Sequence, residues 1–408
     1  MEHQEKEVPN LRFKGFTDPW EQRKLGDAVS ISSGVTGDAT LQDGKYRLTR
    51  IESISQGMLN VAKLGFTNEK PDQKYLLNLG DILYSNINSL SHIGKVALVD
   101  TAGIYHGINL LRFQMRNDVD SEFLFQKLNT MPMKSWAISH ANPAVSQASI
   151  NQTELSKQPI SSPTITEQQK IGSFFKQLDD TIALHQRKLD LLKEQKKGYL
   201  QKMFPKNGAK VPELRFAGFA DAWEQRKLGD AVSISSGVTG DATLQDGKYR
   251  LTRIESISQG MLNVAKLGFT NEKPDQKYLL NLGDILYSNI NSLSHIGKVA
   301  LVDTAGIYHG INLLRFQMRN DVDSEFLFQK LNTMPMKSWA ISHANPAVSQ
   351  ASINQTELSK QPISSPTITE QQKIGSFFKQ LDNTITLQHQ KLAKYQSVKK
   401  SLLQQMFI

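Results

Sequence analysis

The sequence consists of two copies of one unit, repeated at an interval of 203 residues. Trp20–Asp179 recurs without a change as Trp223–Asp382, so a stretch of 160 residues occurs twice. Weaker similarity continues on both sides, joining Val8–Phe13 to Val211–Phe216 and Tyr199–Phe204 to Leu402–Phe407. Solenoid repeats are only about 20 to 50 residues long. The 408 residues therefore predict two copies of one domain, each with an accessory element.

Within a unit the character of the sequence changes once, near Pro163. Before it, short apolar segments rich in β-forming residues are separated by Gly, Asn, Asp and Pro, which indicates a mixed, strand-rich domain. These segments are Tyr46–Leu48, Asp81–Tyr84, Val96–Val99 and Leu110–Phe113. We expect helices over Ser121–Thr130 and Met133–His140. The proline and a following Thr cap predict the start of a long helix.

The expected fold is of the α+β class, with two identical mixed α/β domains that are each followed by a long helix. The predicted division is a first domain at 1–165, a first long helix at 166–204, a linker at 205–222, a second domain at 223–368 and a second long helix at 369–408.

The long helix carries an apolar seam, meaning positions spaced alternately four and three residues apart. In the first copy the seam is Ile171, Phe175, Leu178, Ile182, His185, Leu189, Leu192, Lys196, Tyr199 and Met203. In the second copy it is Ile374, Phe378, Leu381, Ile385, Gln388, Leu392, Tyr395, Lys399, Leu402 and Met406. Eight of ten positions in each copy are apolar, which predicts a coiled coil.

The alternative is a single amphipathic helix lying on its own domain. However, the 38 residues of Glu167–Phe204 would span roughly 57 Å, whereas a compact domain of this size is about 30 to 35 Å across. The two long helices are thus expected to pair with each other. Antiparallel pairing places one domain at each end with an approximate two-fold axis, whereas parallel pairing would force the linker to climb the helix.

The composition excludes several classes of protein. There is no cysteine, which rules out disulfides and thiolate zinc sites and fits a reducing cytoplasm. No apolar run is long enough for a bilayer, and the polar, acidic N-terminus does not resemble a signal peptide. We therefore expect a cytoplasmic protein.

The motifs of catalysis are missing or incomplete. Ile93–Val96 lacks the first glycine and the hydroxyl of a phosphate-binding loop, and the histidines form no metal-ligand spacing. Asn142–Val145 lacks the second proline and the aromatic residue of a base-methylating loop, and Pro71–Lys74 lacks the acidic-x-lysine of a nuclease core. The sequence predicts a binding protein with no catalytic residue and no metal site.

The net charge of +9 suggests an anionic partner such as nucleic acid. Each copy of Trp20–Asp179 nevertheless holds 16 basic and 15 acidic residues, so the two domains are almost neutral. Residues 180–222 and 383–408 carry +4 each. The excess therefore lies on the helices and the linker.

A domain that contacts DNA needs only one basic face. Three basic residues cluster beside a predicted strand, and two polar loops, 86–95 and 140–147, carry short side chains suited to reading base edges. The predicted DNA-binding residues of the first copy are Lys45, Arg47, Arg50, Asn86, Asn88, Ser89, Ser91, His92, Lys95, Asn142 and Gln147. Those of the second copy are Lys248, Arg250, Arg253, Asn289, Asn291, Ser292, Ser294, His295, Lys298, Asn345 and Gln350. Ordinary turn chemistry is the alternative for both loops.

A set of short motifs, in order and in duplicate, resembles the specificity subunit of bacterial type I restriction-modification systems. These motifs are Val211–Phe216 with Gly218-Phe219, Trp223–Gly229, Leu79–Leu83 followed by Ile93–Lys95, and Glu167–Ile171 at the start of the long helix. The resemblance covers nearly the whole chain.

The resemblance implies two target-recognition domains, each reading one half of a bipartite sequence in double-stranded DNA, and two helices that fix the unread spacer. It implies as partners two modification (methyltransferase) subunits, which carry S-adenosylmethionine, and restriction (endonuclease and translocase) subunits, which use ATP and Mg. This chain itself would be a non-catalytic subunit that binds no cofactor.

The identity of the two domains departs from the family, whose two recognition domains usually differ. Identical domains about a two-fold axis predict an interrupted palindrome as the target, because operator symmetry mirrors protein symmetry. A helix of roughly 57 Å would span about 17 base pairs, and the half-site centres would lie somewhat closer than that. The alternatives are a free-standing DNA-binding protein, such as a transcription regulator, and a structural scaffold.

Overall fold

The computed structural model describes residues 8–55, 57–143, 147–206, 208–258, 260–345 and 350–407. The chain forms two compact units, one of Met1–Gln186 with Gln390–Ile408 and one of Arg187–His389. Both boundaries fall inside the two long helices, so each unit contains one domain, the start of one long helix and the end of the other. Among the described residues, no helix has the length and apolar character required to cross a membrane.

The first domain is built on a six-stranded mixed sheet in the order β2-β11-β7-β9-β5-β4. Its strands are β2 (Val29–Ser33), β4 (Ile54–Ser55), β5 (Met58–Leu59), β7 (Ile82–Tyr84), β9 (Val96–Leu98) and β11 (Leu111–Met115). A three-stranded sheet, β10-β3-β6, contains β3 (Tyr46–Leu48), β6 (Gly65–Thr67) and β10 (Ile104–Tyr105). Two strand pairs complete the domain, β1 (Glu21–Lys24) with β13 (Pro159–Ser162) and β8 (Ile87–Asn88) with β12 (Ala148–Ser149).

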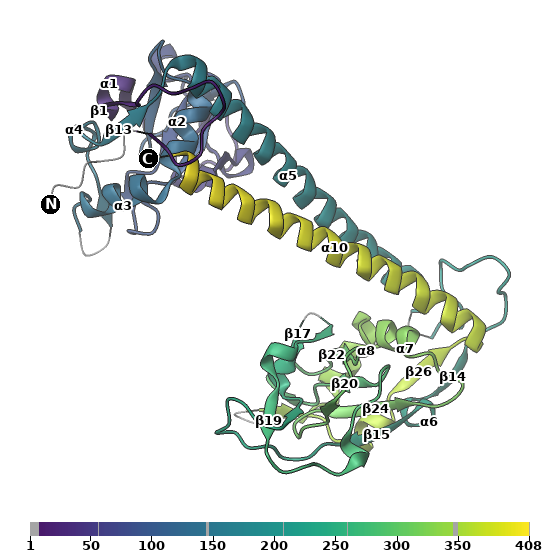
Figure 1. Cartoon of the computed structure of the whole chain (residues 1–408). Helices are drawn as coiled ribbons and strands as arrows, with labels where there is room; N and C mark the ends of the chain where they lie inside the picture. Colours follow the sequence, from purple (N-terminus) through teal and green to yellow (C-terminus); the bar gives the residue numbers. More distant parts are fainter. Residues whose placement is uncertain are drawn as a thin grey trace. The chain divides into compact units, whose positions relative to one another are not determined.

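The helices of the first domain share one buried core cluster with this sheet, and Figure 1 labels all four of them. They are α1 (Leu25–Ala28), α2 (Ser121–Leu128), α3 (Met131–Ser139) and α4 (Gln152–Leu155), with 3-10 turns η1 (Ile51–Ser53), η2 (Val61–Lys63) and η3 (Gln73–Tyr75). The α2 helix begins at a side-chain cap, because Asp120 accepts from the backbone N–H of Phe123. The mixed α+β fold predicted from the sequence is confirmed.

The second domain repeats the first. Its strands are β14 (Glu224–Lys227), β15 (Val232–Ser236), β16 (Tyr249–Leu251), β17 (Ile257–Ser258), β18 (Met261–Leu262), β19 (Gly268–Thr270), β20 (Ile285–Tyr287), β21 (Ile290–Asn291), β22 (Val299–Leu301), β23 (Ile307–Tyr308), β24 (Leu314–Met318), β25 (Ala351–Ser352) and β26 (Pro362–Ser365). Its helices are α6 (Leu228–Ala231), α7 (Ser324–Leu331), α8 (Met334–Ser342) and α9 (Gln355–Ser359), with η4 (Ile254–Ser256), η5 (Val264–Lys266) and η6 (Gln276–Tyr278). Sheet orders and strand registers correspond to those of the first domain.

Two long helices follow the domains: α5 (Ile165–Lys202) and α10 (Ile368–Met406). Nineteen of the twenty seam positions are buried or half-buried. The exception is Tyr395, which is 36 % exposed, yet its ring stacks on that of His185 with 5.0 Å between centroids. The helix-pairing positions predicted from the sequence thus lie on the inner faces of the helices.

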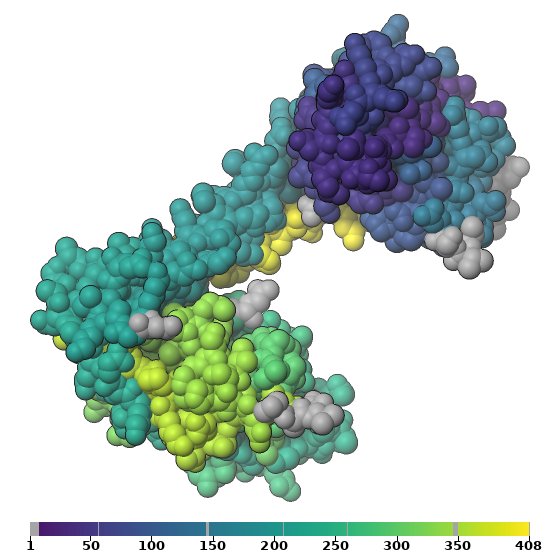
Figure 2. All heavy atoms as spheres, turned by 180° about the vertical axis from the view of Figure 1, so that it is seen from behind, coloured from purple at the N-terminus to yellow at the C-terminus, as the bar shows by residue number. Residues whose placement is uncertain are grey.

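The start of α5 packs against the end of α10 in the first unit. Ile171 and Phe175 share one buried cluster with Met406 and Phe407. The chain end marked C lies beside α2 in Figure 1, and the yellow end of α10 reaches the purple and blue atoms of the first domain in Figure 2.

The second unit makes the same contact with the helices exchanged. Its buried cluster joins Ile374 and Phe378, near the start of α10, to Met203 and Phe204, at the end of α5. In each unit a helix start meets the other helix's end, so the pairing is antiparallel, as the sequence predicted.

The segment preceding each domain is fastened to the start of the long helix that follows the same domain. Arg12 donates two hydrogen bonds of 2.7 Å to Glu167, whose side chain is fully buried. Arg215 makes the matching bidentate contact with Glu370. Bidentate pairing compensates the burial of the carboxylate, so the interdomain linker is held at a defined place on the second unit.

Candidate nucleic-acid interface

The two polar loops predicted to read DNA lie next to each other. Strand β8 belongs to the first loop and pairs antiparallel with β12, which follows the second. Asn142 forms a further bridge to Ser149. Residues 144–146 and 346–349 of the second loops lie outside the described residues, so the juxtaposition rests on the residues around them.

The side chains of the first loop divide into two groups. Asn86 is half-buried and donates from its amide to the carbonyl of Ile150 at 3.1 Å, so it holds the two loops together. Asn88 accepts from the backbone N–H of Ser89 at 2.7 Å. Asn289 and Asn291 make the same contacts in the second copy. These asparagines therefore shape the loop.

The tip of the loop is a small hydrogen-bonded cluster. The hydroxyl of Ser89 lies 3.0 Å from that of Ser91 and 2.8 Å from Nδ1 of His92. Both serines are exposed and Lys95 is exposed just beyond them. Ser292, Ser294, His295 and Lys298 form the same arrangement. This tip presents hydroxyl, imidazole and ammonium groups to a ligand, the mixture of donors and acceptors that base edges require.

The three basic residues near β3 lie on the three-stranded sheet and not on the loop strands. Lys45 and Arg47 are exposed. Arg50 is half-buried, donates weakly to the carbonyl of Asp38 at 3.4 Å and covers Gly65, where a β-carbon would lie 2.2 Å from its Nε. Lys248, Arg250 and Arg253 are placed alike. Lys45 and Arg47 are available for phosphate contact, whereas Arg50 mainly supports the backbone around it.

The ends of the second loops are described on either side of their gaps. Gln147 and Gln350 are exposed, and Asn142 and Asn345 are exposed as well. Helix α3 leads into the first of these loops, and Trp136 stacks on His140 with 3.9 Å between ring centroids and 14° between planes. Trp339 and His343 repeat this stack.

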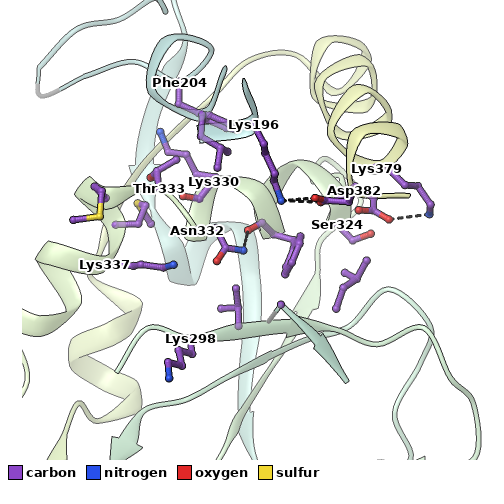
Figure 3. A pocket seen from close by; sticks show the side chains of 18 of the residues that line it. Lys196, Phe204, Lys298, Ser324, Lys330, Asn332, Thr333, Lys337, Lys379 and Asp382 are labelled. Atoms are coloured by element: carbon purple, nitrogen blue, oxygen red, sulfur yellow. Dashed lines mark hydrogen bonds and ion pairs between the residues drawn. The ribbon is translucent and has the colours of Figure 1, made fainter. Parts of the chain in front are cut away.

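A groove of about 1920 Å³ opens in the second unit between the domain and its parts of the long helices (Figure 3). Its lining includes the loop residue Lys298, Lys337 and Trp339 of α8, and Lys196 of α5. Sequence reasoning selected Lys298 but missed Lys337. It noted Lys196 only as a polar residue that interrupts the apolar helix seam. That interruption was the one sign in the sequence that Lys196 has a role other than helix packing.

The polar interruption is explained by an ion pair across the helices. Lys196 donates to Asp382 at 2.6 Å, and Gln329 of α7 donates to the same carboxylate at 2.8 Å. The domain and both long helices therefore meet at one carboxylate in the second unit. Among the described residues, no group of three or more His, Cys, Asp or Glu side chains could hold a metal ion.

The comparisons with known proteins agree with this architecture. The family model described as the type I restriction modification DNA specificity domain matches residues 17–194 and 220–396. The chain belongs to this family of DNA specificity subunits, and it carries two of the family's target-recognition domains.

Particular relatives extend over the full length. The chain is 25 % identical to a putative type I restriction enzyme MjaX specificity subunit from Methanocaldococcus jannaschii, covering 98 % of this chain and 96 % of that one. It is 23 % identical to the MjaVIII specificity subunit of the same organism, over 98 % and 93 %.

Solved structures show the same fold at low identity. The S subunit of a type I restriction-modification system from M. genitalium matches with a TM-score of 0.67 at 15 % identity, covering 98 % of this chain and 99 % of that one. A chain from a structure that describes complex assembly and conformational transition of the type I R-M system matches with a TM-score of 0.51 at 15 % identity, over 94 % and 96 %.

Proposed function

We propose that this chain is the sequence-reading subunit of a type I restriction-modification complex and that its target is an interrupted palindrome in double-stranded DNA. The observation that carries the proposal is the identity of the two recognition domains, whose loop tips make the same hydrogen bonds in both copies. Identical domains joined by an antiparallel helix pair would present the same loop chemistry to opposite strands of the DNA. Protein symmetry of this kind is mirrored in the target sequence.

In this proposal the long helices set the unread spacer between the half-sites and dock two modification subunits. Large apolar side chains on the outer faces of the helices support the docking role. Leu184, Leu191 and Leu387 are 64 %, 59 % and 58 % exposed, and these are the side chains that we assign to contact with the docked subunits. Restriction subunits would join the same complex.

The chemistry of methylation and cleavage would then belong to the partners. Modification subunits would hold S-adenosylmethionine, restriction subunits would use ATP and Mg, and this chain would contribute recognition without a cofactor or a catalytic residue of its own. The docking groups and the reading groups lie on different elements, which supports a division of this kind.

Mapping of methylated bases tests the proposal directly. The chain is co-expressed with modification subunits, and genomic DNA from that host is read by single-molecule sequencing. The expected result is one interrupted palindrome, methylated in both half-sites. Two unlike half-sites would contradict the palindrome, and absence of new methylation from a complex that assembles would contradict recognition.

A one-sided variant sharpens this test. Asn291→Ala with His295→Ala alters the loop of the second copy alone. The expected target keeps one half-site and changes or relaxes the other, so the mapped site becomes asymmetric. The matched variant, Asn88→Ala with His92→Ala, should give the same asymmetric site, because the duplex can be read from either end.

The second candidate is a free-standing DNA-binding protein, which the hydrogen-bonded loop tips would also serve. Gel shifts with the mapped duplex, with and without modification subunits, separate the two. A specificity subunit is expected to bind weakly alone and tightly in the complex. Equal, tight binding in both conditions would favour the free-standing protein.

A further inference from the structure

The groove of the second unit is lined by an excess of positive charge. Among its described lining residues are eight lysines and four carboxylates. Four of these lysines have ion-pair partners: Lys196 with Asp382 at 2.6 Å, Lys379 with Glu325 at 2.8 Å, Lys197 with Glu194 at 3.6 Å, and Lys206 with Glu213. A volume of about 1920 Å³ exceeds the roughly 300 to 1,000 Å³ of ordinary small-ligand pockets. The groove is therefore suited to a large anion.

Three lysines from different elements gather in this groove: Lys298 at the end of the loop that precedes β22, Lys337 in α8 and Lys196 in α5. We call them the lysine triad. A β-carbon placed on Gly297 would lie 3.7 Å from Cγ of Lys337, so the α8 lysine lies against the loop that ends in Lys298. Figure 3 shows all three along the groove.

The helix lysine of the triad is paired with a carboxylate, Lys196 with Asp382 here and Lys399 with Asp179 at the equivalent place of the first unit, whereas the other two lysines are not. Within the part of the chain that the structure describes, neither Lys298 nor Lys337 makes an ion pair. Burial lowers the pKa of Lys337, and the charges of Lys196 and Lys298 lower it further. Lys298 is exposed, whereas Lys337 and Lys196 are half-buried. Placing the half-buried ammonium group of Lys337 beside other ammonium groups costs free energy unless an anion binds there.

The first unit holds the same triad in Lys95, Lys134 and Lys399. A β-carbon on Gly94 would lie 3.6 Å from Cγ of Lys134, and burial, Lys399 and Lys95 lower the pKa of Lys134. Lys399 and Lys196 lie in helix segments that otherwise differ between the copies, because only Trp20–Asp179 is repeated unchanged. Lys196 and Lys399 thus occupy equivalent positions, although the neighbouring sequence of the two helices differs.

We propose that the lysine triad of each unit binds phosphate groups of the target duplex beside the half-site that the same unit reads. This inference rests on the proposed function and deepens it. The triad is continuous with the loop tip, since Lys298 closes the loop that carries Ser292 and His295. Backbone contacts next to base contacts fix register without carrying sequence information.

An acidic segment of a partner protein is the competing occupant, and salt dependence distinguishes the two. Each phosphate contact that is lost reduces the slope of log K against log salt by about 0.9. The full chain is titrated with a random-sequence duplex between about 50 and 200 mM salt. Lys134→Gln with Lys337→Gln removes one contact in each unit, so the slope should fall by about 1.8.

Two matched variants serve as controls, and all proteins are first compared by urea unfolding. Lys134→Arg with Lys337→Arg keeps the charges, so its slope should differ from the wild-type slope by less than about 0.9, the value for one phosphate contact. Lys188→Gln with Lys391→Gln removes the same number of charges from exposed positions of the long helices and should leave the slope unchanged.

An unchanged slope in the Lys134→Gln, Lys337→Gln protein would overturn the inference. Loss of modification-subunit binding at an unchanged slope would overturn it as well and would assign the groove to a protein. Absence of duplex binding both by the lone wild-type chain and by its complex with modification subunits would overturn both this inference and the proposed function. If methylation mapping finds two unlike half-sites while the salt titration shows the expected loss of slope, only the palindrome is contradicted.

Discussion

The ammonium group of Lys399 lies 2.6 Å from one carboxylate oxygen of Asp179 and 2.8 Å from the other. Gln126 of α2 donates to the same carboxylate at 2.8 Å. The first domain, its own long helix and the end of the other long helix are therefore joined at one side chain. Lys196, Asp382 and Gln329 make the same junction in the second unit.

Neutralising this carboxylate should loosen both units. Asp179→Asn with Asp382→Asn keeps an acceptor for the glutamine but removes the charge that pairs with the lysine, at an expected cost of about 1 to 3 kcal/mol per unit. Urea unfolding measures it. Asp180→Asn is the matched control, because the second copy already has Asn383 there. Equal stability of the two variants would show that the junction contributes nothing.

Removing Arg215, which fastens the linker to Glu370, should lower the free energy of unfolding by a larger amount. Arg215→Ala leaves the buried carboxylate of Glu370 without its bidentate donor, and an uncompensated buried charge costs about 3 to 5 kcal/mol. Arg215→Lys should recover only part of this, since an ammonium cannot donate in the same fork. Chemical unfolding together with limited proteolysis of the linker checks the order of the two variants. Lys210→Ala, at an exposed position of the linker, should behave as wild type.

The phenylalanines that end the two repeats are expected to be core residues. Phe407 packs on Trp20 and Phe123 in the first unit. Phe407→Ala should destabilise that unit by about 3 to 5 kcal/mol, seen as an earlier transition in thermal unfolding. Phe204→Ala should do the same to the second unit. Leu184→Ala removes an exposed side chain and should leave unfolding unchanged, and a comparable loss from it would refute the assignment.

Stability should fall in mild acid because of one buried histidine in each unit. His106 donates from Nε2 to the carbonyl of Leu110 at 3.0 Å, and burial, with a smaller effect of Arg112, lowers its pKa from 6.5 to about 4. The neutral ring is favoured in the folded state, so its contribution is complete above about pH 6.5 and is lost as the pH falls towards 4. The loss should amount to about 3 kcal/mol per histidine.

Urea unfolding over this pH range, with a matched pair of variants, isolates the histidine effect. His309 has the same contact and the same lowered pKa, so His106→Gln is combined with His309→Gln. The difference between this protein and wild type should shrink as the pH falls. His389→Gln, at an exposed position, should leave the pH profile of wild type intact. A constant difference would contradict the expectation.

The sequence predicted the features that depend on local or repeated patterns. The exact repeat indicated two like domains, and the seam indicated paired helices, because burial of one helix face imposes a spacing that can be counted. The lysines at seam positions 196 and 399 were visible as interruptions. Their acidic partners were not, since those come from the other helix and no spacing relates the two.

Contacts between distant segments escaped prediction for the same reason. The Arg12–Glu167 pair joins residues 155 positions apart, and Lys134 meets the loop that ends in Lys95 only through the packing of α3. Asn86 was predicted to read bases, and its amide also holds the two loops together through the carbonyl of Ile150. A polar side chain in a loop has the same sequence signature in either role.

The way each unit is assembled from the chain sets an order of completion during synthesis. The second unit is one continuous stretch, Arg187–His389, whereas the first requires Gln390–Ile408 as well as Met1–Gln186. Chains emerge from the ribosome at about 5 to 20 residues per second. Roughly 10 to 40 s therefore pass between the synthesis of Gln186 and that of Phe407, and during this time the aromatic cluster around Trp20 lacks Phe407. The domain translated first is thus the one whose core closes last, and premature termination anywhere after Gln186 leaves it open.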